Sequence, residues 1–376
     1  MGSPSANEYA KSGVDYRKIE PFKQAMIEVG TRTLDFPRKR DVEVLRGAIH
    51  SHGGLYRYFG YRPHIWCVTQ EGLGNKSWIA EYMYKNAEDG RTYYEWIGWD
   101  AALMAVNDVI AQGAMPVVYT DEVAVGDDDW FKDEKRARDL ANSYYEISRT
   151  VGMALPAGES PALRYLLKSA RPVKSAPSLS GSVVGIIAPS SRFISGAKLS
   201  VGDIILGALS SGVHCNGLSL VIKRAKELHE NFLTKLPTGR TLGEESLLPT
   251  VSYVGLVEAL LEAKIDIHAL LPATGSGLGK IAYDKRPFTY RVHSWVDVPP
   301  IFRFMRELGV SLSDCLVTFN WGIGYYVFVP REEVNRAKSA AFAAGCPLFE
   351  LGIVEKGERK VIFEPGGGII LNPPGE

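Results

Sequence analysis

Residues 210–217, which read SSGVHCNG, have the composition of a loop that binds an anion. Small side chains let backbone N–H groups approach a phosphate, and a helix that starts directly afterwards would add its positive N-terminal end. The imidazole of His214 could donate a further hydrogen bond. The alternative is a tight connection in which Asn216 caps the helix. Spacing alone leaves both interpretations open, with Ser211, Gly212, His214 and Asn216 as the candidate phosphate ligands.

A second segment, residues 71–76, places a carboxylate and an amine at the two ends of a glycine-rich turn. Glu71 would face a magnesium ion and Lys76 a phosphate, because carboxylate oxygens bind Mg²⁺ and an ammonium group binds phosphate as a point charge. Gly72 and Gly74 would let the backbone approach a nucleotide closely. Turns of this kind are also common on surfaces, so the turn alone does not identify a nucleotide site.

Two further segments carry carboxylates next to small residues. Asn107 and Asp108 lie in a stretch with helical periodicity, on a polar ridge beside an apolar face. Glu159 follows a predicted strand and a glycine, where α/β folds place ligand-binding groups. Asp108, Glu159 and Glu71 are therefore candidate metal ligands. The alternatives are a solvated helix face for Asp108 and a cap or a surface charge for Glu159.

Other segments carry no such prediction. Residues 274–280 resemble a P-loop, but Thr274 stands where that motif needs glycine and Ile281 where it needs serine or threonine. His50 and His52 have no further metal ligand nearby in the sequence, so ordinary loop residues are the expectation. The acidic residues 127–129 predict a solvated loop.

Strands and helices alternate along the chain, which predicts an α/β or α+β fold. The predicted strands cover residues 65–69, 116–120, 153–157, 182–188, 203–209, 325–329 and 348–354. The predicted helices cover residues 99–112, 131–151, 218–229, 250–264 and 331–344, and another begins at Pro300. The length favours two domains, which we place at residues 1–188 and 189–376.

The composition limits the kinds of binding partner and cellular location that the sequence predicts. Lys and Arg together number 43, as do Asp and Glu, so no net charge favours nucleic acid or an anionic membrane. The four cysteines are too far apart for a zinc half-site, and so few in so long a chain do not predict disulfides. No apolar run is long enough for a membrane span, and the first ten residues do not form a signal peptide. We therefore expect a cytoplasmic protein.

Several segments, taken in order, resemble the aminoimidazole ribonucleotide synthetase family. The most specific is AVNDVIAQGAMP at residues 105–116, which is similar to the family's C-V-N-D-I-L-V-Q-G-A-E-P. Residues 210–220 resemble S-S-G-P-H-S-N-G-Y-S-L, and residues 72–76 resemble the turn D-G-V-G-T-K. Further similar segments are residues 9–15, 53–56, 298–302 and 318–324.

The resemblance implies a two-domain fold, with an N-terminal ATP-binding domain that dimerises through its sheet and a C-terminal α/β domain. It also implies an enzyme, a cyclo-ligase of purine biosynthesis that uses ATP and Mg²⁺. ATP activates the formyl amide oxygen of formylglycinamidine ribonucleotide, an internal nitrogen attacks, phosphate leaves and the imidazole closes. The expected partners are this small-molecule ribonucleotide and a second copy of the chain, with no nucleic acid and no membrane.

The resemblance also assigns roles to the candidate residues. Lys76, Asp108 and His214 would be catalytic. The nucleotide and its metal would be bound by Glu71, Gly72, Gly74, Lys76, Asn107, Asp108 and Glu159. The ribonucleotide phosphate would be bound by Ser211, Gly212, His214 and Asn216.

This sequence departs from the family at ligand positions rather than core positions. Glu71 replaces an aspartate, Asn75 a threonine and Pro272 a histidine, while Leu163 lies in the segment that lacks a second glutamate. Residues 249–253 lack the family's arginine. Two alternatives therefore remain open. One is another ATP-dependent, phosphoryl-activating enzyme of the same superfamily, and the other is a nucleotide-binding paralogue without catalysis.

Overall fold

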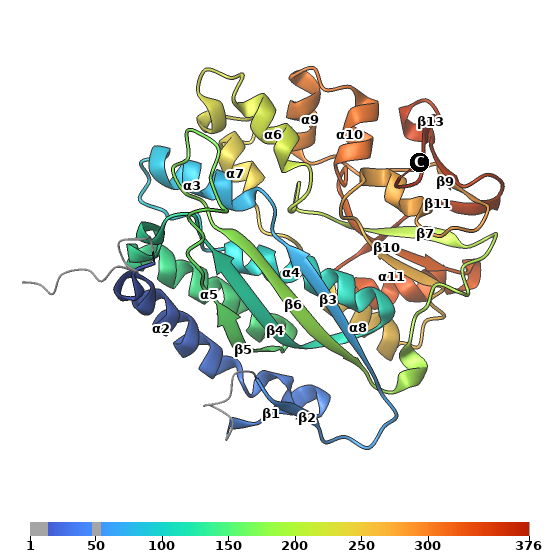
Figure 1. The fold of residues 1–376 in the computed structure, drawn as a ribbon. Coiled ribbons are helices and arrows are strands. Elements are labelled where there is room, and N and C mark those ends of the chain that lie inside the picture. Colours follow the sequence, from blue (N-terminus) through green and yellow to red (C-terminus); the bar gives the residue numbers. More distant parts are fainter. Residues whose placement is uncertain (1–13, 47–53, 376) are drawn as a thin grey trace, which may run out of the picture. The chain divides into compact units, whose positions relative to one another are not determined.

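Two large sheets organise the chain in the computed structural model, which describes residues 14–46 and 54–375 (Figure 1). The first has four strands in the order β3-β6-β4-β5, and the second has seven in the order β13-β12-β9-β11-β7-β10-β8. Strands β1 and β2 form a separate pair. Strands and helices alternate along the chain, so the predicted α/β class is confirmed.

The first half of the chain supplies the four-stranded sheet and its helices. Its strands are β1 (Val42–Val44), β2 (Tyr56–Tyr58), β3 (Ile65–Gly72), β4 (Met115–Ala124), β5 (Ala154–Glu159) and β6 (Ser178–Ile187). Its α-helices are α2 (Tyr16–Thr33), α3 (Lys76–Asn86), α4 (Ile97–Val109) and α5 (Glu134–Val151). Short 3₁₀ turns are η1 (Phe36–Arg40), η3 (Ile110–Gln112), η4 (Asp128–Lys132) and η5 (Ser190–Arg192).

The second half supplies the seven-stranded sheet. Its strands are β7 (Ile204–Leu209), β8 (Ala269–Pro272), β9 (Phe288–Val292), β10 (Ile323–Val329), β11 (Leu348–Lys356), β12 (Lys360–Phe363) and β13 (Ile369–Leu371). Its α-helices are α6 (Leu218–Ala225), α7 (Leu242–Ser246), α8 (Val254–Glu262), α9 (Pro300–Glu307), α10 (Leu312–Thr318) and α11 (Val334–Ala343). Short 3₁₀ turns are η6 (Asn231–Leu233), η7 (Gly277–Ala282), η8 (Arg331–Glu333) and η9 (Glu364–Gly366).

The chain forms two compact units, and no single boundary in the sequence separates them. Unit 1 takes the described residues within Met1–Tyr61, Val68–Ala105 and Pro116–Val184, and unit 2 takes Arg62–Cys67, Val106–Met115 and those from Gly185 on. The main change occurs near the predicted boundary at residue 188. The two short segments that belong to unit 2 lie outside that prediction, because their contacts are made with residues distant in the sequence.

Burial explains the pattern of the four-stranded sheet. Strand β4 is mostly apolar because both of its faces are covered, and eight of its ten residues are buried. In contrast, β3 is an edge strand whose residues are all exposed or half-buried, including Trp66 and Val68. Helix α2 packs against α5 and β5 within unit 1 (Figure 1).

Helix α4 ends where the sequence predicts. The 3₁₀ turn η3 continues it to Gln112, and Gly113 follows with a φ of 80°. A side chain at this position would be strained by that left-handed φ, and its Cβ would lie 2.5 Å from the carbonyl oxygen of Arg192. Glycine therefore permits both the turn and the close approach.

Three predicted helices have different bounds. The helix predicted from residue 131 begins at Glu134, capped by the side chain of Asp133, and the one predicted to residue 229 ends at Ala225. The helix predicted from residue 250 begins at Val254, because residues 249–253 bond to other segments. The predicted loop residues His50 and His52 lie outside the described residues.

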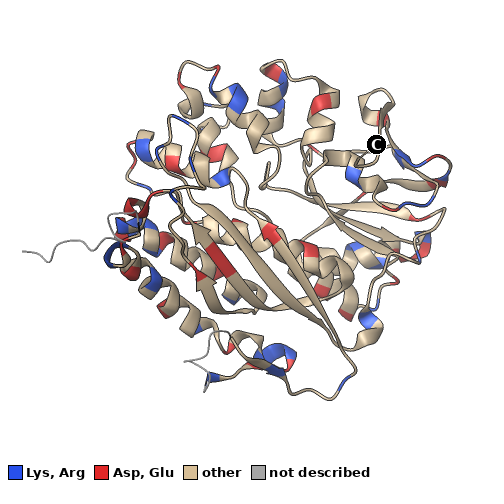
Figure 2. Ribbon diagram, in the orientation of Figure 1, with Lys and Arg blue, Asp and Glu red and all other residues tan. Residues whose placement is uncertain are grey.

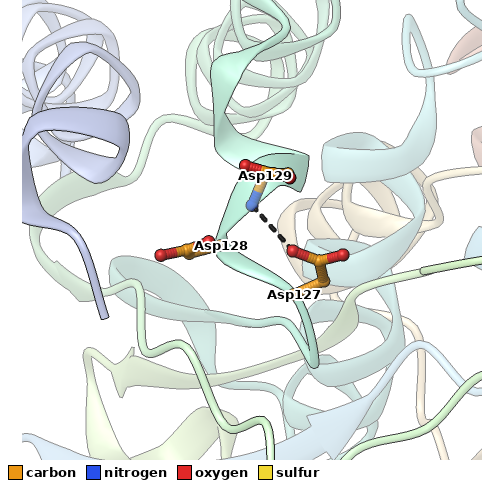
Figure 3. Close-up of side chains that lie close together, drawn as sticks. All are labelled: Asp127, Asp128 and Asp129. Carbon is orange, nitrogen blue, oxygen red and sulfur yellow. Dashed lines mark hydrogen bonds between the residues drawn. The ribbon is translucent and has the colours of Figure 1, made fainter. Parts of the chain in front are cut away.

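The expectation of a solvated acidic loop at residues 127–129 is wrong for Asp128, whose side chain is 1% exposed. Its carboxylate accepts from the Asp15 backbone N–H at 2.9 Å and from Lys18 Nζ at 2.7 Å. One carboxylate oxygen from each aspartate lies within 4.8 Å of the others, but the three side chains point in different directions (Figure 3). Lys18, Lys132 and Lys174 also contact this cluster, so it is a neutralised structural junction.

We predict that Asp128→Ala lowers the free energy of unfolding by about 2–3 kcal/mol, because it leaves a backbone donor and an ammonium group without their acceptor. Asp129→Ala is the matched control, since its side chain is 47% exposed, and should cost less than about 1 kcal/mol. Urea denaturation measures both. Equal losses in the two variants would show that Asp128 has no special role in holding the start of α2.

Candidate functional site

The predicted glycine-rich turn joins β3 to α3 in unit 1. Leu73 donates its N–H to the Leu179 carbonyl at 2.9 Å, and Gly74 takes a φ of 70°. Lys76 is the first residue of α3, with Asn75 before it as an N-cap that makes no side-chain bond to the helix. The strand and the turn are therefore as predicted, whereas helix α3 was not predicted, and the turn is held by its backbone.

Lys76 has a contact that the sequence did not suggest. Its ammonium group lies 2.7 Å from a carboxylate oxygen of Asp100, and both side chains are 0% exposed. Asp100 lies in the first turn of α4, so the pair connects the start of α3 to the start of α4. The role of Lys76 as a phosphate ligand remains a prediction, but the residue is a buried structural cation as well.

A carboxylate pair lies at the ends of two neighbouring parallel strands. Asp121 on β4 is in register with Gly158 on β5, and Glu122 with Glu159. Asp121 is 7% exposed, whereas Glu159 is exposed at the edge of the sheet. Burial, together with the charge of Glu159, raises the pKa of Asp121 to about 7.

Gly158 makes room for this pair. A Cβ at position 158 would lie 2.2 Å from Oδ1 of Asp121, which is too close for any side chain. The glycine that precedes Glu159 is therefore required by the Asp121 carboxylate. Sequence reasoning missed Asp121, although its place near the end of a buried strand was a usable signal.

In unit 2, Asn107 holds the segment that precedes α8. Its side-chain amide donates to the Val251 carbonyl at 2.9 Å and accepts from the Tyr253 N–H at 3.2 Å. Asn107 is 5% exposed, so these two bonds satisfy a buried amide. Burial raises the pKa of the Tyr325 phenol, and the charge of the half-buried Asp108 carboxylate adds to the rise.

The loop at residues 210–217 is built by its own side chains and by Asn320. Ser210 Oγ donates to Asn320 Oδ1 at 2.9 Å, and the Asn320 amide donates to the Gly212 carbonyl at 2.7 Å. Ser211 Oγ donates to the Pro249 carbonyl at 2.5 Å. Gly217, with a φ of 78°, is the N-cap of α6 and makes no side-chain cap bond, so the alternative of Asn216 as the cap is wrong.

His214 is 5% exposed, and its ring is oriented by backbone amides. Nε2 accepts from the N–H of Ser211 at 3.3 Å and lies 3.5 Å from the N–H of Val251. A nitrogen that accepts carries no proton, so the neutral ring bears its proton on Nδ1. Gly324 lies against this ring, since a Cβ there would be 2.7 Å from Cε1.

Each unit contains some of the predicted residues, and the contacts of unit 2 bring several of its own onto one segment. Unit 1 contains Glu71, Lys76 and Glu159, with Asp121 added by the structure. Unit 2 brings Asn107 and the loop at residues 210–217 onto one segment, residues 249–253. His268 lies four residues before Pro272, where the family has a histidine, but its Nδ1 bonds to Asp203 at 2.8 Å, so it does not take the place of that histidine.

Comparisons with known proteins identify the family of this chain. Residues 61–187 match the family described as AIR synthase related protein, N-terminal domain, and residues 200–364 match its C-terminal domain. A phosphoribosylformylglycinamidine cyclo-ligase of Alkaliphilus oremlandii is 35% identical, over 84% of this chain and 89% of that protein. One of Pyrococcus horikoshii is 31% identical, over 94% of this chain and 96% of that protein.

Solved structures show the same fold at lower identity. Thiamine-monophosphate kinase from Stenotrophomonas maltophilia has a TM-score of 0.59 at 16% identity and covers 89% of this chain and 95% of its own. Hydrogenase maturation protein HypE in complex with ATP has a TM-score of 0.58 at 18% identity and covers 87% of this chain and 90% of its own. These similarities establish the fold.

We predict that Asp100→Asn lowers the free energy of unfolding by about 3–5 kcal/mol, because it leaves the Lys76 ammonium buried without a countercharge. Replacing both residues, as Lys76→Met with Asp100→Leu, should cost less than the two single changes added together. Urea unfolding of the parent, Lys76→Met, Asp100→Leu and the double variant measures this coupling, and Asp100→Asn is measured beside them. Additive losses would mean that the two charges do not stabilise each other.

Asp121 predicts a pH dependence of stability. Its pKa in the folded chain, about 7, is above its ordinary value of 3.8, so between these values the folded chain binds more protons than the unfolded chain. The free energy of unfolding should therefore fall as pH rises through this range. Asp121→Asn should lessen the fall, so that the variant gains stability relative to the parent above pH 7.

Denaturation at several pH values with a chelator present measures this effect. Glu122→Gln, one residue along the same strand, is the control and should keep the pH dependence of the parent. An Asp121→Asn protein with an unchanged pH dependence would contradict the raised pKa.

Proposed function

Because this chain belongs to the AIR synthase related family, we propose that it is a cyclo-ligase that converts formylglycinamidine ribonucleotide to aminoimidazole ribonucleotide in purine biosynthesis. The observation that carries the proposal is similarity over nearly the whole chain to relatives with this name, in both domains. ATP would phosphorylate the formyl amide oxygen, an internal nitrogen would attack, and phosphate would leave as the ring closes.

The groups of unit 1 suit the metal–nucleotide part of this reaction. Within residues 14–46 and 54–375, no cationic side chain forms an ion pair with Asp121 or Glu159 at the ends of β4 and β5. The raised pKa of Asp121 reflects burial first and the like charge of Glu159 second. A divalent cation would relieve that repulsion, and carboxylate oxygens are the ligands that Mg²⁺ prefers. Glu71, in the same unit, is a further candidate ligand, and Asp108, in unit 2, is a candidate by the family's motif alone. Bound Mg²⁺ would neutralise charge on the transferring phosphoryl group.

Gly72, Gly74 and Lys76 would serve the nucleotide phosphates. The turn gives backbone N–H groups at the start of α3, where the helix end favours negative charge. The pairing of Lys76 with Asp100 fixes the position of its ammonium group. A cation that is already fixed loses no conformational freedom when negative charge develops on the phosphoryl group.

The loop at residues 210–217 would hold the ribonucleotide phosphate through Ser211, Gly212 and Asn216. His214 would act mainly by keeping this loop in shape, since its Nε2 is engaged with the Ser211 amide. Asn107 would act in the same way on residues 249–253. Both residues then influence the reaction by positioning, which differs from the catalytic role that the resemblance implies for His214.

We also propose that two copies associate through the four-stranded sheet. Its edge strand β3 carries exposed apolar side chains, which are Ile65, Trp66 and Val68. An exposed apolar edge strand favours pairing with another chain.

Acidic and basic residues are interspersed over the ribbon (Figure 2). This distribution gives no field of a single sign that would attract nucleic acid. No helix in residues 14–46 and 54–375 is long and apolar enough to cross a membrane, and a cytoplasmic location remains our proposal.

A different phosphoryl-activating reaction of the same superfamily is the second candidate. Pro272 and residues 160–163 depart from the family at ligand positions, and His268 does not compensate because it bonds to Asp203. A substrate other than formylglycinamidine ribonucleotide would account for these departures. ATP binding without turnover on any ribonucleotide would instead indicate a paralogue without catalysis.

We predict that the parent releases ADP from ATP only when formylglycinamidine ribonucleotide is present, and that Asp108→Asn lowers kcat at least a hundredfold. The half-buried variant side chain keeps its shape, so the melting temperature should change little. Coupled ADP detection and chromatography of the imidazole product measure activity. Lys338→Gln, an exposed change on α11, is the control. Full activity in Asp108→Asn would remove Asp108 from the site, and no turnover by the parent would contradict the cyclo-ligase assignment.

A further inference from the structure

A separate basic pocket lies in unit 1, after the ends of β4 and β5. Its volume is about 390 Å³, and Arg164, Lys168, Lys174, Ser169 and Ser175 are among the residues that line it. None of Glu71, Lys76, Asp121 and Glu159 lines this pocket, so it is not the metal–nucleotide site proposed above. Its size is in the range of pockets that bind small molecules.

The backbone around the pocket is fixed by several hydrogen bonds. Val125 and Ala162 form a parallel bridge beyond β4 and β5, and the Leu163 N–H donates to the Val125 carbonyl at 2.6 Å. Trp78 Nε1, in the first turn of α3, donates to the Ala170 carbonyl at 2.8 Å. A Cβ at Gly126 would lie 2.2 Å from the Leu167 carbonyl oxygen, so the backbone at Leu167 approaches position 126 as closely as a glycine there allows.

The charges on the pocket do not balance. Lys174 pairs with Asp127, the one carboxylate in the lining, at 3.2 Å. Arg164 and Lys168 have no ion-pair partner anywhere in the described chain. The pocket thus carries an excess of two positive charges, whereas the whole sequence is neutral.

The pocket also has an unused donor. The Ser175 hydroxyl oxygen is buried and has no hydrogen-bond partner among residues 14–46 and 54–375. Ser169 Oγ accepts from the Ala176 N–H at 2.7 Å, which leaves its own proton free to donate. A buried polar group without a partner costs stability unless a ligand or water satisfies it.

We infer that this pocket binds a phosphate group of a small anionic ligand. Two uncompensated cations match a phosphate dianion better than a singly charged carboxylate, and the serine hydroxyls supply donors to its remaining oxygens. The volume exceeds that of one phosphate, so the pocket also has room for the rest of a phosphorylated molecule. The inference does not depend on the proposed cyclo-ligase activity.

Calorimetric titration of the full chain with inorganic phosphate tests it, with no nucleotide or metal present. We expect saturable binding that weakens as ionic strength rises. The double change Arg164→Gln with Lys168→Gln should weaken binding by roughly tenfold or more, because it removes two charge-assisted contacts. Lys23→Gln with Lys85→Gln removes the same charge from exposed positions of α2 and α3 and should leave binding unchanged.

Ser175→Ala provides a second measurement, because its expected result differs from the result of partial unfolding. It removes a hydroxyl that lacks a partner, so the melting temperature should stay level or rise while phosphate binds more weakly. Competition by ribose 5-phosphate would identify a sugar phosphate as the occupant, and competition by tripolyphosphate a nucleotide tail. The absence of saturable binding, or equal weakening in the two double variants, would overturn the inference.

Discussion

The buried ion pair between Lys76 and Asp100 is the constraint on which the unit 1 site depends. Two charged side chains with no exposed area must satisfy each other, since the cost of burying either alone is several kcal/mol. Their pairing fixes the first residue of α3 against the first turn of α4. The glycine-rich turn before Lys76 is therefore held at both ends, by β3 on one side and by a charge on the other.

The same helix α4 connects this constraint to the residues of unit 2. Asp100 lies in its first turn, and Asn107 and Asp108 lie in its last. The Asn107 amide bonds to residues 249–253, the segment that Ser211 and His214 also contact. These polar side chains thus fix the backbone that lies against the proposed phosphate loop at residues 210–217. Such positioning explains why Asn107 is buried although its motif is polar.

Sequence alone predicted the strands and the turns that carry the candidate residues, because buried apolar runs and glycine breaks are local signals. It missed the short strands β8, β9, β12 and β13 and the helix α3. It also missed α2, whose inward residues Ile19, Phe22 and Val29 have helical spacing, because the exposed Pro21 lies inside that helix. It also extended α8 backwards over residues 250–253. The polar backbone groups of that segment bond instead to Asn107 and His214, which are distant in the sequence.

The misjudged side chains share one cause. The structure buries both Asp128 and Asp121, one against Lys18 and a backbone amide and the other beside Gly158. A sequence pattern gives the type of a side chain but not its long-range partner.

That partner decides whether a carboxylate is structural or functional. Asp128 has a cation and a backbone donor, so its charge is already satisfied by the fold. For Asp121, burial raises the pKa to about 7, and the charge of Glu159 on the neighbouring strand adds to the rise. A cation bound near the ends of β4 and β5 would stabilise the ionised form of Asp121, so its burial fits a functional carboxylate rather than a structural one.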